Sequence, residues 1–191
     1  WLSVALPDIT RTDYLLVLGA NPLVSNGSMW TVPDFRGKAR ALQARGGKLV
    51  VVDPRKTETA AGAAAHHFIR PNSDVFLLAA MVNTLFAEGL VQLEKLGTVA
   101  QWVNGVDAVQ QAIAPFTPEA AAPRCGISAD TIRALTRELA AAPRAAVYAR
   151  IGTCTQEYGT LASWLGDVLN TLTGNLDNEG GVLFAKSAAF A

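Results

Sequence analysis

Three apolar runs between residues 14 and 74 constrain the fold more than any other feature. They cover residues 14–19, 48–53 and 67–70, and each leads into small, polar or charged residues. Runs that are apolar on both faces are typical of central strands in a parallel sheet. A helix expected from Pro33 to the Gly46-Gly47 pair separates the first two runs. A strand–helix–strand unit of this length implies a right-handed parallel crossover.

The rest of the chain extends the same alternation. A fourth strand is expected at residues 145–151, and helices are expected at 57–65, 73–88, 128–142 and 160–173, with Ser73, Ser128 and Thr160 as N-caps. No repeat or low-complexity linker divides residues 1–191. The sequence therefore predicts a single α/β domain with an open, mostly parallel Rossmann-like sheet and helices on both faces.

Composition excludes several classes of function. The chain has 16 Lys and Arg against 16 Asp and Glu, and no basic stripe, so nucleic-acid binding lacks its electrostatic source. Its longest apolar run, residues 75–85, is too short to cross a membrane. Cys125 and Cys154 lie far apart and are expected to be buried thiols rather than zinc ligands. His66 and His67 are adjacent, so on a strand they point to opposite faces and do not form a metal pair.

Polar residues after the strands predict a ligand site at one edge of the sheet, because ligands of open α/β sheets bind beyond the strand carboxyl ends. The Asn21 amide, the carboxylates of Asp53 and Asp74, and the Arg55 guanidinium suit a nucleotide. Each also has a structural alternative: Asn21 and Asp53 as turn formers before proline, Asp74 at a helix N-terminus, and Arg55 as a solvated charge. An NAD site fits poorly, because the chain has no GxGxxG motif and Asp53 lies too far along.

Four ordered segments together resemble the molybdopterin oxidoreductases of the dimethyl-sulfoxide-reductase type, which include formate dehydrogenases and nitrate reductases. These segments are residues 18–22 (LGANP), 51–60 (VVDPRKTETA), 69–74 (IRPNSD) and 172–177 (LTGNLD). The resemblance implies a Rossmann-like domain that grips one of two molybdopterin guanine dinucleotides, with molybdenum or tungsten in the parent enzyme.

Within that resemblance, residues 18–25 would contact the diphosphate, 53–57 the guanosine and 72–74 the guanine. The loop at 151–156 would reach toward the pterin and the metal. No catalytic or metal-ligating residue is expected in this chain. The expected cofactor-binding residues are Leu18, Gly19, Ala20, Asn21, Pro22, Ser25, Asp53, Pro54, Arg55, Thr57, Asn72, Ser73, Asp74, Ile151, Gly152 and Thr155.

The resemblance also implies that the chain is a fragment of a larger catalytic subunit and is inactive alone. The metal ligand, and an iron–sulfur cluster if the parent has one, would lie upstream of it. Expected partners are the remaining domains of the parent and electron-transfer subunits. A cytoplasmic location is expected, or a periplasmic one if the parent carries a twin-arginine signal.

Two alternatives stay open at the level of sequence. One is a metal-free scaffold subunit related to the large subunit of respiratory complex I, which the presence of Asn21, Asp53 and Asp74 disfavours. The other is a generic nucleotide-binding module, such as the middle domain of thiamin-diphosphate enzymes. Molybdenum content of the parent tests the first alternative, and a preference for adenine nucleotides would indicate the second.

Overall fold

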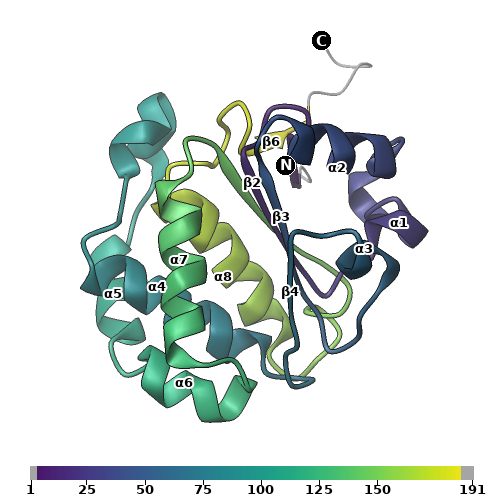
Figure 1. Ribbon diagram of the computed structural model, residues 1–191. Coiled ribbons are helices and arrows are strands. Elements are labelled where there is room, and N and C mark those ends of the chain that lie inside the picture. Colours follow the sequence, from purple (N-terminus) through teal and green to yellow (C-terminus); the bar gives the residue numbers. More distant parts are fainter. Residues whose placement is uncertain (1–3, 186–191) are drawn as a thin grey trace.

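A four-stranded parallel sheet with strand order β4-β3-β2-β5 forms the centre of the molecule (Figure 1). The computed structural model describes residues 4–185. The strands are β2 (Tyr14–Leu18), β3 (Lys48–Val52), β4 (Ala65–His67) and β5 (Ala145–Ala149). This arrangement confirms the predicted open parallel α/β sheet.

Strand β2 lies between β3 and β5, and every one of its side chains is buried. Its alternating side chains supply two cores: Leu16 and Leu18 belong to one, whereas Leu15 and Val17 belong to the other. This period of two is the strand geometry itself, and an apolar residue is needed at every position because both faces are covered.

Helices cover both faces of the sheet, as predicted (Figure 1). On one face, α4 (Asp74–Ala87) packs against α7 (Ala129–Ala141) and α8 (Gly159–Leu172). Outside them lie η2 (Leu93–Trp102), α5 (Val106–Ile113) and α6 (Pro118–Cys125). The other face carries α1 (Pro22–Ser25), η1 (Ser28–Trp30), α2 (Phe35–Ala44), α3 (Glu58–Ala61) and the antiparallel pair β1 (Ala5–Pro7) and β6 (Val182–Phe184).

Several predicted boundaries were wrong. Strand β4 spans Ala65–His67 rather than residues 67–70, because it pairs in register with Val50–Val52 and has no partner further on. Helix α2 begins at Phe35 rather than at Pro33, since the Asp34 side chain caps it by accepting a hydrogen bond from the Gly37 amide at 3.0 Å. The short elements η1 and β1 were not predicted.

The expected caps had mixed outcomes. Ser128 caps α7 as predicted, through the amide of Thr131 at 3.2 Å. Helix α8 begins at Gly159 rather than after a Thr160 cap, and a Cβ at Gly159 would lie 2.0 Å from the Cys154 carbonyl oxygen. The backbone of the preceding loop therefore packs directly on the first turn of α8. Within residues 4–185, no helix is both long and apolar enough to cross a membrane.

Strand β5 is an edge strand that α8 shields. The Asn170 side chain accepts from the Val147 amide at 2.8 Å and donates to the Val147 carbonyl at 2.9 Å. Asn175, from the 172–177 signature segment, accepts from the Ala145 amide at 2.9 Å. These amide side chains take the place of a further strand, so the buried edge keeps its backbone hydrogen bonds.

Candidate functional site

A cavity of about 360 Å³ lies where the loops after β2, β3, β4 and β5 converge. This volume is within the range of small-molecule sites, roughly 300–1,000 Å³. The cavity is lined by Gly19, Ala20, Asn21, Asp53, Pro54, Arg55, Thr57, Pro71, Asn72, Asp74, Ile151, Gly152 and Thr155. Four loops far apart in the sequence thus form one site, as the parallel topology requires.

The loops after β2 and β5 touch through their backbones. The Gly152 amide donates to the Gly19 carbonyl at 2.9 Å, and Gly19 has φ +55°. A Cβ at Gly19 would lie 2.8 Å from the Thr153 nitrogen, closer than side chains pack. Glycine is needed here for both its left-handed conformation and its lack of a side chain.

Asn21 joins the loop after β2 to α3. Its Oδ1 accepts from the amide of Thr59 at 3.3 Å and from its hydroxyl at 2.8 Å, and its Nδ2 donates to Glu58 at 2.7 Å. The side chain is therefore used within the protein. In contrast, the backbone amides of Ala20 and Asn21 make no hydrogen bond with residues 4–185. The hydrogen-bond donors that remain unpaired in this loop are therefore backbone groups.

The loop after β3 contains a turn-forming carboxylate, Asp53, and an exposed guanidinium group, Arg55. Asp53 Oδ1 accepts from the Arg55 amide at 2.8 Å, so the predicted turn-forming role of Asp53 is present and engages one carboxylate oxygen. Thr57 caps α3 by accepting from the Ala60 amide at 3.1 Å. The Arg55 side chain is 67% exposed and lies 3.6 Å from Glu58, a weak surface pair.

Asp74 supplies a desolvated carboxylate at the start of α4. Burial raises the pKa of Asp74 above its ordinary value, and the nearby Asp53 acts in the same direction. Opposing this, Gln156 Nε2 donates to Asp74 Oδ2 at 2.9 Å and also to the Thr153 carbonyl at 3.0 Å. Gln156 Oε1 is buried and has no partner within residues 4–185. The hydrogen bond between Gln156 and Asp74 links the loop at 151–156 to α4.

Four of the expected residues lie outside the cavity lining. Leu18 is in the core, and Pro22 and Ser25 belong to α1. Ser73 occupies the N-cap position of α4 but donates to the Arg70 carbonyl at 2.5 Å instead of capping the helix.

Pro71 and Thr59 both stand inside signature segments, Pro71 in residues 69–74 and Thr59 in residues 51–60, but nothing in the sequence signalled the contact of Thr59 with Asn21.

Neither the cysteines nor the histidines line the cavity. Cys125 is buried as expected, and burial raises its pKa. The prediction for Cys154 was wrong, because this thiol is only half-buried; its Sγ lies 3.3 Å from the Ser163 hydroxyl. His66 lies 3.0 Å from the Asp53 carbonyl, and its ring packs against that of Phe68. Residues 4–185 contain no group of three or more His, Cys, Asp or Glu side chains that could hold a metal ion.

Fold and site together define an α/β domain with a four-stranded parallel sheet, helices on both faces and a cavity at the carboxyl ends of the strands. The chain belongs to the molybdopterin oxidoreductase family, whose model matches residues 1–186. This family uses a molybdopterin cofactor with molybdenum or tungsten.

Comparison with individual proteins agrees with this assignment. The chain is 35% identical over 184 residues to the thiosulfate reductase molybdopterin-containing subunit PhsA of Salmonella typhimurium, covering 95% of this chain and 23% of that protein. It is 31% identical over 175 residues to formate dehydrogenase H of Escherichia coli, covering 92% and 23%. The chain therefore spans about a quarter of the length of these relatives.

A solved structure shows the same fold. Acetylene hydratase from Pelobacter acetylenicus superposes with a TM-score of 0.78 at 24% identity, covering 90% of this chain and 23% of that one. At this identity, the likeness concerns the fold alone.

Proposed function

We propose that this domain holds the guanosine diphosphate part of one molybdopterin guanine dinucleotide in a larger molybdenum or tungsten oxidoreductase. The observation that carries the proposal is that Asp53 and Asp74 line the same cavity as the unpaired backbone amides of Ala20 and Asn21. Acceptors for a base and donors for a phosphate are thereby offered within one nucleotide-sized space.

Asp74 suits the guanine end. Guanine presents its N1–H and amino group side by side, and a carboxylate accepts from both. Because burial has removed water from Asp74, the donors of a base would replace lost hydration and favour the charged form. Gln156 fixes the carboxylate from the other side through its hydrogen bond to Oδ2.

The loop after β2 suits the diphosphate end. Gly19 and Ala20 let the backbone approach a ligand closely, and the amides of Ala20 and Asn21 are free to donate to phosphate oxygens. Arg55 adds a mobile positive charge at the cavity, since its pair with Glu58 is weak. Asn21 itself would act indirectly, by holding the loop against α3.

The bound cofactor would carry the redox chemistry at its metal, and the residues of this chain would bind and orient it. The parent is proposed to be an oxidoreductase of the formate dehydrogenase or nitrate reductase type, with a bis form of the dinucleotide. An upstream iron–sulfur cluster and separate electron-transfer subunits belong to the same proposal. The names of the relatives, among them a thiosulfate reductase subunit and a formate dehydrogenase, support it.

Calorimetry of the 191-residue domain with GDP and ADP tests the guanine assignment. GDP should bind more tightly than ADP, and Asp74→Asn should weaken GDP binding roughly 10- to 150-fold, corresponding to a charged hydrogen bond worth about 1.5–3 kcal/mol. Asp130→Asn is the matched control, because the Asp130 side chain is fully exposed on α7. Equal affinity for ADP, or equal effects of the two substitutions, would contradict a guanine site.

The parent enzyme offers a second test that does not depend on the isolated domain. Acid hydrolysis of the purified holoenzyme should release GMP in proportion to its molybdenum or tungsten content. Metal-loaded enzyme that releases no guanine nucleotide would show that the cofactor lacks the dinucleotide form.

A further inference from the structure

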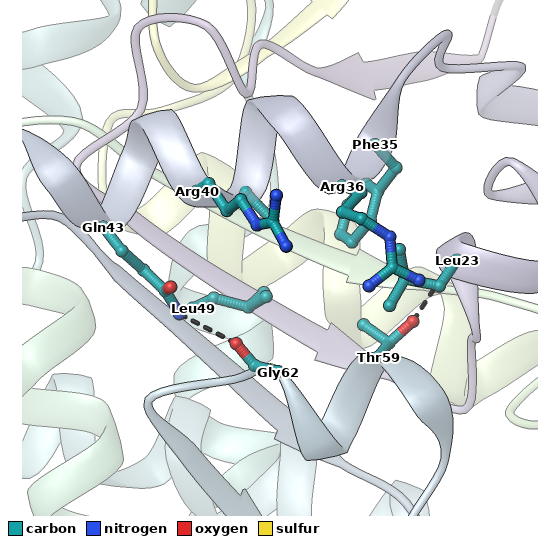
Figure 2. A pocket seen from close by; sticks show the side chains of 9 residues that line it. Leu23, Phe35, Arg36, Arg40, Gln43, Leu49, Thr59 and Gly62 are labelled. Carbon is teal, nitrogen blue, oxygen red and sulfur yellow. Dashed lines mark hydrogen bonds between the residues drawn. The ribbon is translucent and has the colours of Figure 1, made fainter.

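A second concave site lies between α2 and α3, beside the cavity described above (Figure 2). Its volume is about 180 Å³. The floor is apolar and consists of Leu23, Phe35 and Leu49, of which Phe35 is 3% exposed and Leu49 1% exposed. We call this site the α2–α3 groove.

Two arginines stand over the groove without an acidic partner. Arg36 and Arg40 lie one turn apart on α2, and Figure 2 shows their guanidinium groups projecting toward the space between the two helices. Neither forms an ion pair or a side-chain hydrogen bond with residues 4–185, whereas other arginines, such as Arg137 and Arg144, each form paired hydrogen bonds with a carboxylate.

Two acidic residues adjacent in sequence to elements of the groove, Asp34 and Glu58, are already engaged. The Asp34 carboxylate caps α2, and Glu58 accepts from Asn21. No Asp or Glu is among the described residues that line the groove. In a chain whose formal net charge is zero, the groove is therefore a local excess of positive charge.

The groove is preformed. Gln43 Nε2 donates to the Gly62 carbonyl at 2.9 Å across one end, and Thr59 Oγ1 accepts from the Leu23 amide at 3.1 Å at the other (Figure 2). Walls that are already fixed lower the entropic cost of binding a segment.

We propose that the α2–α3 groove receives an acidic segment of the parent polypeptide from outside residues 1–191. In this arrangement a carboxylate pairs with Arg36 and Arg40, and a neighbouring apolar side chain rests on the groove floor. The planar guanidinium groups match carboxylate oxygens geometrically, and such pairs gain strength as water is excluded. A free inorganic anion would leave the apolar floor uncovered.

The source of the segment follows from the family assignment. Because the chain covers only 23% of the relatives named above, about three-quarters of each relative is polypeptide that lies outside the matching region. A segment of the same polypeptide is present at high effective concentration, so the weak contacts of a small groove suffice to hold it.

The groove is also connected to the cofactor cavity. Thr59 lines the groove and donates its hydroxyl to Asn21, which lines the cavity. A segment seated in the groove would hold α3 and hence the loop after β2. The proposal nevertheless stands apart from the nucleotide assignment, since it concerns a different surface and a different ligand.

Zero-length carbodiimide cross-linking of the full-length parent tests the proposal, because the reagent joins Lys amines to carboxylates and leaves arginine unmodified. In the Arg36→Lys/Arg40→Lys variant, mass spectrometry should find new cross-links from position 36 or 40 to an acidic residue outside residues 1–191. Lys38 is the internal control, as it lies on α2 outside the groove lining and donates to the Pro33 carbonyl. Cross-links only to residues 1–191, to another copy or to a separate subunit would overturn the proposal, as would none.

Charge reversal provides an independent measurement. Arg40→Glu in the full-length enzyme should lower its Tm by more than the control variant Lys38→Glu does. The control Lys38→Glu makes the same change of charge on the same helix. Substituting Arg for the cross-linked acid should restore the Tm of the Arg40→Glu variant. Equal losses in the two variants, or no restoration, would refute the pairing.

Discussion

Replacing Gly19 by alanine should destabilise the domain through two separable costs. The first is conformational: an alanine at φ +55° adopts the left-handed region, at a cost of about 1–2 kcal/mol. The second is steric, because the new Cβ would lie 2.8 Å from the Thr153 nitrogen and 3.0 Å from the Gly152 Cα. These neighbours are backbone atoms that cannot rotate away, so overpacking should add about 1–3 kcal/mol. The total loss should be about 2–5 kcal/mol.

Gly46→Ala isolates the conformational cost. Gly46 has φ +86°, and a Cβ there would have no neighbour within 4 Å, so only the loss of about 1–2 kcal/mol is expected. Urea unfolding of both variants, followed by circular dichroism, measures the difference at equal m-value. Because Gly19 and Gly152 share one contact, the double variant Gly19→Ala/Gly152→Ala should lose less than the sum of its single losses. A Gly19→Ala loss no larger than that of Gly46→Ala would refute the close contact of the two loops.

The remaining predictions concern a buried carboxylate, a buried amide and a thiol. The folded-state pKa of Asp74 is raised above 3.8, so the protonated carboxyl stabilises the fold fully below pH 3.8. This stabilisation is lost as the pH rises through the folded pKa and the carboxyl ionises. Asp74→Asn should therefore stabilise the domain at pH 7, with the gain disappearing in acid; a loss at pH 7 would contradict this. Asn170→Leu should cost about 2–6 kcal/mol in urea unfolding, since it leaves two buried backbone groups of Val147 unpaired, whereas the exposed control Asn104→Leu should stay within about 0.5 kcal/mol. A thiol reagent should label half-buried Cys154 in the folded protein and Cys125 only on unfolding, which peptide mapping would check.

Three of the strands were predictable because burial on both faces requires apolar residues along the strand. This requirement fixed β2, β3 and β5, and their parallel order then placed the polar residues after them at one edge. The third strand was misplaced because Phe68 and Ile69 favour a strand by composition. Pairing decides instead, since β4 can extend only as far as its partner β3, whose Val52 pairs with His67.

Local signals failed where distant backbone decides the structure. The expected cap at Thr160 follows from its side chain, yet α8 already includes Gly159, against which the Cys154 carbonyl packs. Leu161, in the first turn of α8, is 44% exposed, whereas Leu165 and Leu169 further along the helix are buried. The loop after β2 likewise gives no sequence sign of its contact with Thr59, which lies 38 residues further along.

The contacts of the cavity residues separate those that build the site from those with capacity left for a ligand. Thr57 and Asn21 use their side chains within the protein, so replacing either should weaken folding and binding together. Asp74 is different, because its burial opposes the charged form while the fold offers it one side-chain donor from Gln156. The ionised Asp74 lowers the stability of the domain without ligand, and hydrogen-bond donors from a ligand would offset that loss. Asp74→Asn should therefore raise the stability of the domain and lower its affinity for GDP, a combination that a purely structural role for Asp74 does not produce.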